Sequence, residues 1–128
     1  MAWTWRGRGA EVKERSPMRA TAQDRVRLEE AVLSLTEQLK ALGAVRVILF
    51  GSLARGEISL FSDIDMLVLF DLERPSHELT RWVYQQIRTG EAIDILAYGQ
   101  HAFQKIRDRP FFHRVLQEGK VLYERPGT

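Results

Sequence analysis

Hydrophobic and polar residues alternate along the chain with two different periods. Between Thr21 and Leu42 the apolar positions recur every three or four residues, which predicts an amphipathic helix with Gly43 as its stop signal. Short apolar runs rich in β-branched residues predict three strands: AVRVILF (44–50), IDMLVLF (64–70) and EAIDILAY (91–98). The pattern therefore predicts a long helix, two strands in succession, and a third strand further along.

The segments around the third strand return to a helical period. A helix is expected to begin at about Ser76, before that strand. Two short helices are expected after it, around 100–107 and 110–118, and KVLYE (120–124) is either a short terminal strand or an extended tail. This order predicts an α/β (α+β) fold, a small mixed β-sheet with helices packed mainly on one face.

Charge divides the 128 residues into two parts. Five of the 19 cations but only two of the 17 anions lie in residues 1–20, so the remaining residues carry 14 cations and 15 anions. We expect a flexible basic extension over 1–20 and a single folded domain over 21–128. A near-neutral body does not favour direct nucleic-acid binding.

Several classes of protein are excluded by what the sequence lacks. No apolar run approaches the ~20 residues that span a bilayer, and the N-terminal residues lack the apolar core of a secretory signal. The sequence contains no cysteine, which excludes disulfides and thiolate metal sites. We therefore expect a cytoplasmic protein with no membrane partner.

The first candidate chemistry lies directly after the predicted strand 44–50. Gly51 and Ser52 leave that strand in a turn where the missing Cβ lets a phosphate approach the backbone, and the serine adds a hydroxyl donor. Arg55 supplies a planar set of donors suited to phosphate oxygens. A Gly-Ser turn alone is also common in loops without any ligand, so the hypothesis of a phosphate-binding turn depends on the chemistry of the residues near it.

Two aspartates one residue apart stand at the start of the next predicted strand. Asp63 and Asp65 are expected to point to one face of the sheet with their Cβ atoms roughly 6.5 Å apart, while Ile64 faces the core. Two carboxylates held side by side repel each other, and a divalent cation relieves the repulsion. Mg²⁺ typically takes one or two carboxylates plus substrate phosphates.

A third acid, Asp94, lies within the predicted strand 91–98. Its neighbours Ile93 and Ile95 are expected to face the core, so Asp94 faces the other way. If this strand lies beside 64–70, three carboxylates share one patch, the arrangement of a two-metal site for phosphoryl-type transfer. Asp94 would then be a metal ligand or a general base. The alternative is a carboxylate paired with an arginine, for example Arg46.

The combined string GSLARGEISLFSDIDMLVLF, with AIDIL downstream, resembles the polymerase β-type nucleotidyltransferases, and within them the minimal nucleotidyltransferase (MNT) domains. The resemblance covers about residues 21–124. It implies a nucleotidyltransferase-like fold and a phosphate-binding turn at Gly51 and Ser52. It also implies metal ligands at Asp63, Asp65 and Asp94, and a triphosphate contact from Arg55.

For function, the resemblance implies transfer of a nucleoside monophosphate, most simply AMP from ATP, supported by Mg²⁺ in a two-ion site with Mn²⁺ as an alternative ion. Minimal members are often encoded beside a helical HEPN-type protein, and as antitoxins they transfer AMP to a tyrosine of that toxin. The expected partners are thus a nucleoside triphosphate and a HEPN-type protein, with a homo- or hetero-oligomer left open. The alternatives are an aminoglycoside-type enzyme and a non-catalytic antitoxin that blocks its partner sterically.

Overall fold

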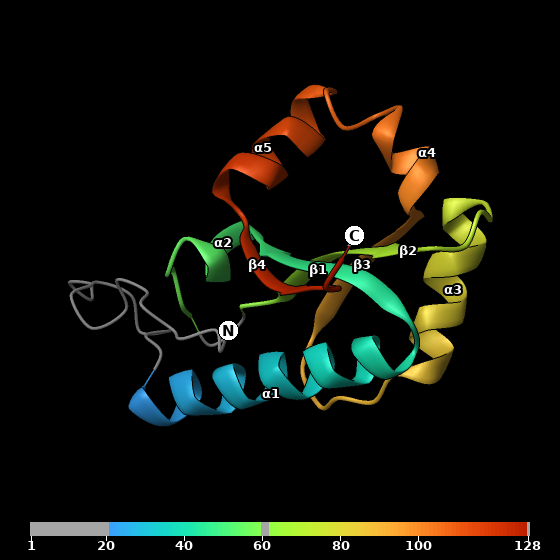
Figure 1. Cartoon of the computed structure of the whole chain (residues 1–128). Helices are drawn as coiled ribbons and strands as arrows, with labels where there is room; N and C mark the ends of the chain where they lie inside the picture. The colour runs from blue at the N-terminus through green and yellow to red at the C-terminus, as the bar shows by residue number, and fades with distance from the viewer. Residues whose placement is uncertain (1–20, 60–61, 128) are drawn as a thin grey trace.

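The computed structural model describes residues 21–59 and 62–127 (Figure 1). The expected extension over 1–20 lies outside these described residues. The elements follow one another as α1 (Ala22–Ala41), β1 (Ala44–Phe50), α2 (Gly51–Ala54), β2 (Ile64–Phe70), α3 (Ser76–Gln86), β3 (Ile93–Gly99), α4 (Gln100–Gln104), α5 (Pro110–Glu118) and β4 (Lys120–Glu124). The strands expected at 44–50 and 64–70 are confirmed residue for residue. Residues 120–124 form a strand rather than an extended tail.

The four strands form one mixed sheet in the order β3-β2-β1-β4. β1 pairs antiparallel with both β2 and β4, and β2 pairs parallel with β3. The two central strands are buried on both faces, which accounts for their continuous apolar runs. The predicted mixed sheet is therefore confirmed, and β2 and β3 enter it in the same direction.

Helices cover both faces of the sheet (Figure 1). The larger hydrophobic cluster joins α1 and α3 to one face, with Leu35 of α1, Met66 of β2 and Val83 of α3 all inaccessible to solvent. A smaller cluster on the other face includes Phe103 of α4 and Phe112 of α5. The expected packing mainly on one face thus describes the two long helices, while the short helices close the second face.

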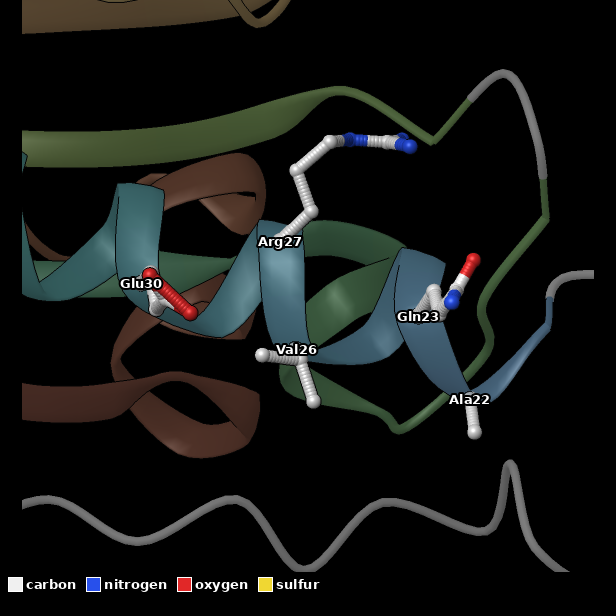
Figure 2. A pocket seen from close by; sticks show the side chains of 5 residues that line it. All are labelled: Ala22, Gln23, Val26, Arg27 and Glu30. Carbon is white, nitrogen blue, oxygen red and sulfur yellow. The ribbon is translucent and has the colours of Figure 1, made fainter.

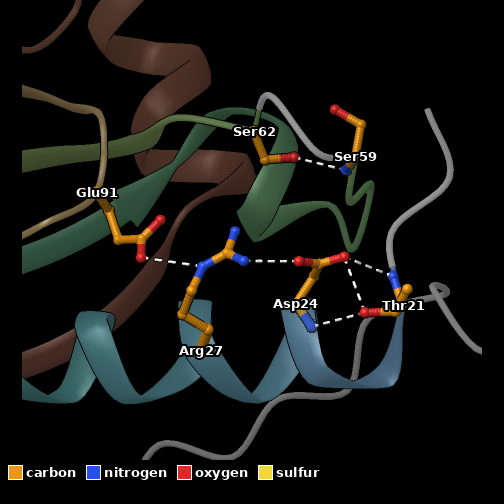
Figure 3. A network of polar contacts seen from close by, with 6 residues as sticks. All are labelled: Thr21, Asp24, Arg27, Ser59, Ser62 and Glu91. Atoms are coloured by element: carbon orange, nitrogen blue, oxygen red, sulfur yellow. Dashed lines mark hydrogen bonds and ion pairs between the residues drawn. The ribbon is translucent and has the colours of Figure 1, made fainter.

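The N-terminus of α1 is held by a polar network (Figure 3). Thr21 and Asp24 form a capping box, in which each residue's backbone N–H donates to the other's side chain. Hydrogen bonds from the Thr21 backbone and hydroxyl lower the pKa of the Asp24 carboxyl. Arg27 then donates to Asp24 at 2.6 Å and to Glu91 at 3.0 Å. Since Glu91 lies just before β3, this network ties the start of α1 to the start of that strand.

Within the residues that the structure describes, no helix combines the length and the apolar character needed to cross a membrane.

Candidate active site

The Gly-Ser turn lies directly against the second aspartate of the pair. β1 ends at Phe50, which pairs with Asp65 across the antiparallel ladder, and α2 begins at Gly51 without an intervening loop. Gly51 has φ +75°, and a Cβ at this position would lie 2.2 Å from Oδ2 of Asp65. Glycine is therefore required twice here, for the backbone conformation and for the close approach of the carboxylate.

The parallel pairing of β2 with β3 brings two of the candidate acids together. Asp65 and Asp94 are partners in this ladder, so the condition set by the sequence, that the two strands be neighbours, is met. Ile64 and Ile95 belong to the cluster under α1 and α3, which confirms that both carboxylates face the opposite side of the sheet. Asp63 directly precedes β2 and is exposed.

The surroundings of Asp65 disfavour the ionised form of its carboxyl group. Partial burial raises the pKa of the Asp65 carboxyl to about 6, and repulsion from Asp94 and Asp63 adds to the rise. The guanidinium of Arg55 opposes the shift without cancelling it. A half-buried carboxylate under these conditions is a poor structural acid but a suitable position for a bound cation.

Asp94 differs in one respect from the expectation of a strand-interior acid. It is exposed to solvent, because the smaller hydrophobic cluster begins further along β3, at Leu96 and Tyr98. The pairing with Arg46 also does not form. Nε of Arg46 instead lies 3.4 Å from Oε2 of Glu124 on the neighbouring strand. Among the described residues, none forms an ion pair with the Asp94 carboxylate.

Arg55 is held beside the site by two glutamates. Its guanidinium donates to Glu57 at 3.1 Å and lies 3.7 Å from Glu118 of α5. These acids raise the pKa of Arg55, the hydrogen bond to Glu57 contributing most. All three side chains are exposed to solvent, so these ion pairs are weak and can be exchanged for a more highly charged anion. Arg55 lies close enough to Asp65 to lower its pKa.

An open pocket of about 420 Å³ adjoins the turn and the acid pair. Ser52, Asp63 and Asp65 line it together with four residues that the sequence pattern did not single out: Glu57, Ile58, Ser59 and Ser62. The backbone N–H of Ser59 donates to the hydroxyl of Ser62 at 2.7 Å, as Figure 3 shows. These wall residues were missed because the segment after α2 has neither helical nor strand periodicity.

A second hollow of about 420 Å³ lies along the first turns of α1 and is lined by residues that Figure 2 labels: Ala22, Gln23, Val26, Arg27 and Glu30. None of the candidate site residues lines it. Its Arg27 is already engaged by Asp24 and Glu91. The turn and the acids thus single out the pocket beside Asp65 as the candidate active site.

The three histidines lie outside this site. His77, His101 and His113 are all exposed, and they lie on three different helices.

Comparison with known proteins assigns the family. The sequence profile described as "Polymerase beta, Nucleotidyltransferase" matches residues 34–127, which include the turn, Arg55 and all three aspartates. The chain belongs to the polymerase β nucleotidyltransferase family. It is accordingly a nucleotidyltransferase.

One similar sequence and one similar solved structure accompany this match. A Methanocaldococcus jannaschii protein named "putative protein adenylyltransferase" is 32% identical over 98 residues, covering 74% of this chain and 97% of the relative. The crystal structure of a "putative nucleotidyltransferase" from Sulfolobus solfataricus superposes with a TM-score of 0.58 at 20% identity. That match covers 82% of this chain and 87% of the other, and it supports the fold alone.

The donor set of the site fits a magnesium ion, although the roles of its residues remain predictions. The described residues contain no group of three acids or histidines close enough to hold a metal by themselves. Mg²⁺ does not need one, since it commonly uses one or two carboxylates and completes its shell with water and phosphate oxygens. Asp63 and Asp65 would supply oxygen ligands beside the turn, where burial and then repulsion from Asp94 and Asp63 raise the pKa of Asp65.

Proposed function

We propose that this nucleotidyltransferase transfers AMP from ATP to a hydroxyl group of a partner protein. The observation that carries the proposal is the close approach of Gly51 to Asp65, which lines an open pocket together with Ser52 and Asp63. This approach brings the Gly-Ser turn and the acid pair to one place. The name of the M. jannaschii relative, whose length this chain covers almost completely, supports a protein as the acceptor.

The nucleotide half of the reaction would use Ser52, Asp63 and Asp65 of the pocket wall, together with Gly51 and Arg55 beside them. The turn at Gly51 and the hydroxyl of Ser52 would bind the triphosphate, with Arg55 leaving its glutamate partners to join them. Asp63 and Asp65 would hold Mg²⁺, with Mn²⁺ as an alternative ion. When bound, the ions would neutralise the triphosphate and stabilise the charge that develops at the α-phosphorus.

The acceptor half would approach from the side of Asp94. A hydroxyl oxygen attacks the α-phosphorus of ATP, a new P–O bond forms, and the bond to the β-phosphate oxygen breaks to release pyrophosphate. The hydroxyl proton passes to Asp94 if that residue is the general base, or to water if Asp94 is a ligand of the second ion. The exposure of Asp94 leaves room for a group presented by another macromolecule.

The acceptor protein that we propose is a helical HEPN-type toxin, which would make this chain its antitoxin. Helices α4 and α5 pack onto the sheet through Phe103 and Phe112, so neither forms a separate acceptor domain. The open pocket is lined by Asp63 and Asp65 and not by Asp94. Within the described part of the chain, the acceptor-binding surface is thus incomplete without a second molecule.

The test is a labelling experiment with ATP that carries the label on its α-phosphate. The chain is incubated with this ATP, Mg²⁺ and the proposed HEPN-type partner, which is sought among the genes beside its own. Label is expected on a hydroxyl side chain of that partner. Asp65→Asn should abolish labelling. Asp71→Asn is the matched control, because Asp71 follows the far end of the same strand and is exposed.

Three outcomes would contradict the proposal. Transfer to an aminoglycoside or another small molecule without labelling of the partner would identify a small-molecule enzyme. Tight binding of the partner without any transfer would identify a steric antitoxin. Undiminished labelling by Asp65→Asn would remove the acid pair from the chemistry.

A further inference from the structure

The hydroxyl of Tyr84 contacts the backbone on both sides of Asp94. The N–H of Ile95 donates to Oη of Tyr84 at 2.8 Å, and the Tyr84 hydroxyl in turn donates to the carbonyl of Ile93 at a longer 3.4 Å. A phenol can accept and donate at the same time, so one oxygen can satisfy both groups. Phenylalanine could do neither.

This contact belongs to a series along the free edge of the sheet. β3 is an edge strand, and its outward backbone groups would lack partners without α3. Thr80 accepts from the N–H of Ala97 at 3.0 Å, and the Ser76 hydroxyl donates to the carbonyl of Ala97 at 2.7 Å. Ser76, Thr80 and Tyr84 are spaced four residues apart, so they lie on one side of α3. The three hydroxyl groups of α3 thus bind outward backbone groups of β3 that a fifth strand would otherwise pair with.

We propose that Tyr84 is a positioning residue for Asp94, in that it fixes the two peptide units from which the Asp94 carboxylate projects toward the Asp65 side. This proposal rests on the function proposed above, in which Asp94 acts in nucleotidyl transfer.

The surroundings of Asp94 explain why its backbone needs this support. No described residue holds the carboxylate through an ion pair, and the side chain is exposed. Its direction therefore depends on the backbone. One side of that backbone is fixed by the parallel ladder, where Asp94 pairs with Asp65. The other side faces the sheet edge, where Tyr84 is the contact.

The three hydroxyl residues differ in what they can influence. Thr80 and Ser76 bind Ala97, three residues beyond Asp94 along the strand, where the side chain is fully buried. Loss of their hydroxyls removes the same kind of edge contact without freeing the peptides beside the acid. Thr80→Val is therefore a matched control for Tyr84→Phe, because both changes delete one hydroxyl from α3 and keep the rest of the side chain's shape.

The experiment combines kinetics with a structural readout. Tyr84→Phe should lower kcat for transfer about 10-fold and leave KM for ATP within about 2-fold, since the misplaced group acts in the transfer step. Thr80→Val should leave both constants within about 2-fold. By NMR, Tyr84→Phe should speed amide exchange of Ile95 and shift the carboxyl carbon of Asp94, while Thr80→Val should affect the Ala97 amide alone.

The outcomes separate this proposal from the function on which it rests. If the wild-type chain transfers no nucleotide to its partner, the proposed function fails, and the NMR comparison still decides whether Tyr84 orients Asp94. An unchanged Asp94 carboxyl signal in Tyr84→Phe would overturn the positioning role. Equal loss of kcat in Tyr84→Phe and Thr80→Val would also overturn it, because the hydroxyls would then support the strand only in general.

Discussion

Replacing Asp65 by asparagine should stabilise the metal-free protein even as it abolishes nucleotide transfer. Partial burial, with repulsion from Asp94 and Asp63, raises the pKa of this carboxyl from 3.8 to about 6. In the unfolded chain the same carboxyl ionises near its ordinary value. At neutral pH, folding therefore places the ionised Asp65 carboxylate where burial and the neighbouring aspartates disfavour its charge. Asparagine keeps the size and shape of the side chain and removes that charge.

The size of the effect follows from the pKa difference. One pKa unit corresponds to about 1.4 kcal/mol, so the full difference would be about 3 kcal/mol. Asp65 keeps part of its contact with water, so the electrostatic penalty is screened and a gain of about 1–2 kcal/mol is expected. The sign follows from linkage, since an acid whose pKa is raised by folding destabilises the folded state when it is ionised. The gain should be complete above pH 6 and should disappear as the pH falls toward 3.8.

The assay is urea unfolding, followed by circular dichroism between about pH 4.5 and pH 8 in the presence of a chelator. Asp71→Asn serves as the control, because Asp71 lies beyond the other end of β2 and is exposed. Added Mg²⁺ and ATP should raise the unfolding midpoint of the wild type and not that of Asp65→Asn. A variant no more stable than the wild type at the alkaline end of this range, or a gain that does not shrink on acidification, would refute the reasoning.

The remaining predictions concern the turn, the core and the cap, each measured by the free energy of unfolding in urea. Gly51→Ala should cost about 2–3 kcal/mol, since its Cβ would collide with Asp65 in addition to the strain of a positive φ. Gly43→Ala is the control, because φ is also positive there but the space is open, and it should cost only about 1 kcal/mol. Equal losses in the two variants would contradict the close contact between Gly51 and Asp65. Phe103→Ala should cost about 3–4 kcal/mol, because this fully buried ring anchors α4 to the sheet, and a loss below about 1 kcal/mol would show that the second face is loosely packed. Thr21→Ala should cost about 1 kcal/mol through loss of the capping box, whereas no change would mean that the cap contributes nothing to α1.

The strands could be predicted closely because their signal is local. The β-branched runs at 44–50 and 64–70 are bounded by glycine and by polar residues, and both strands have these bounds in the structure. The third strand runs from Ile93 to Gly99 instead of 91–98, and Glu91 lies before it and binds Arg27 of α1. No local pattern indicates such a contact between residues 64 positions apart.

The site could be predicted only in part, because its assembly depends on strand order. The sequence indicates that Asp65 and Asp94 face one side of their strands, but their pairing requires β2 and β3 to be neighbours. The exposure of Asp94 and the pairing of Arg46 with Glu124 both follow from the position of β4 and the short helices. The sequence pattern gives no role to the hydroxyl of Tyr84, since the placement of α3 along β3 is needed to reveal what that hydroxyl binds.

The position of the site at the end of the sheet explains how the fold tolerates three acids. Asp63 and Asp94 are exposed and keep their water, so only Asp65 is desolvated. Asp65 is also the carboxylate against which Gly51 packs, and the close approach of that backbone is part of the desolvation. The contact that places the Gly-Ser turn beside Asp65 is thus one that disfavours the ionised carboxylate when no cation is bound. A cation and a triphosphate bound together would supply positive charge to Asp65 and occupy the turn, so the feature that disfavours the carboxylate by itself would contribute to the affinity of the site for its substrate.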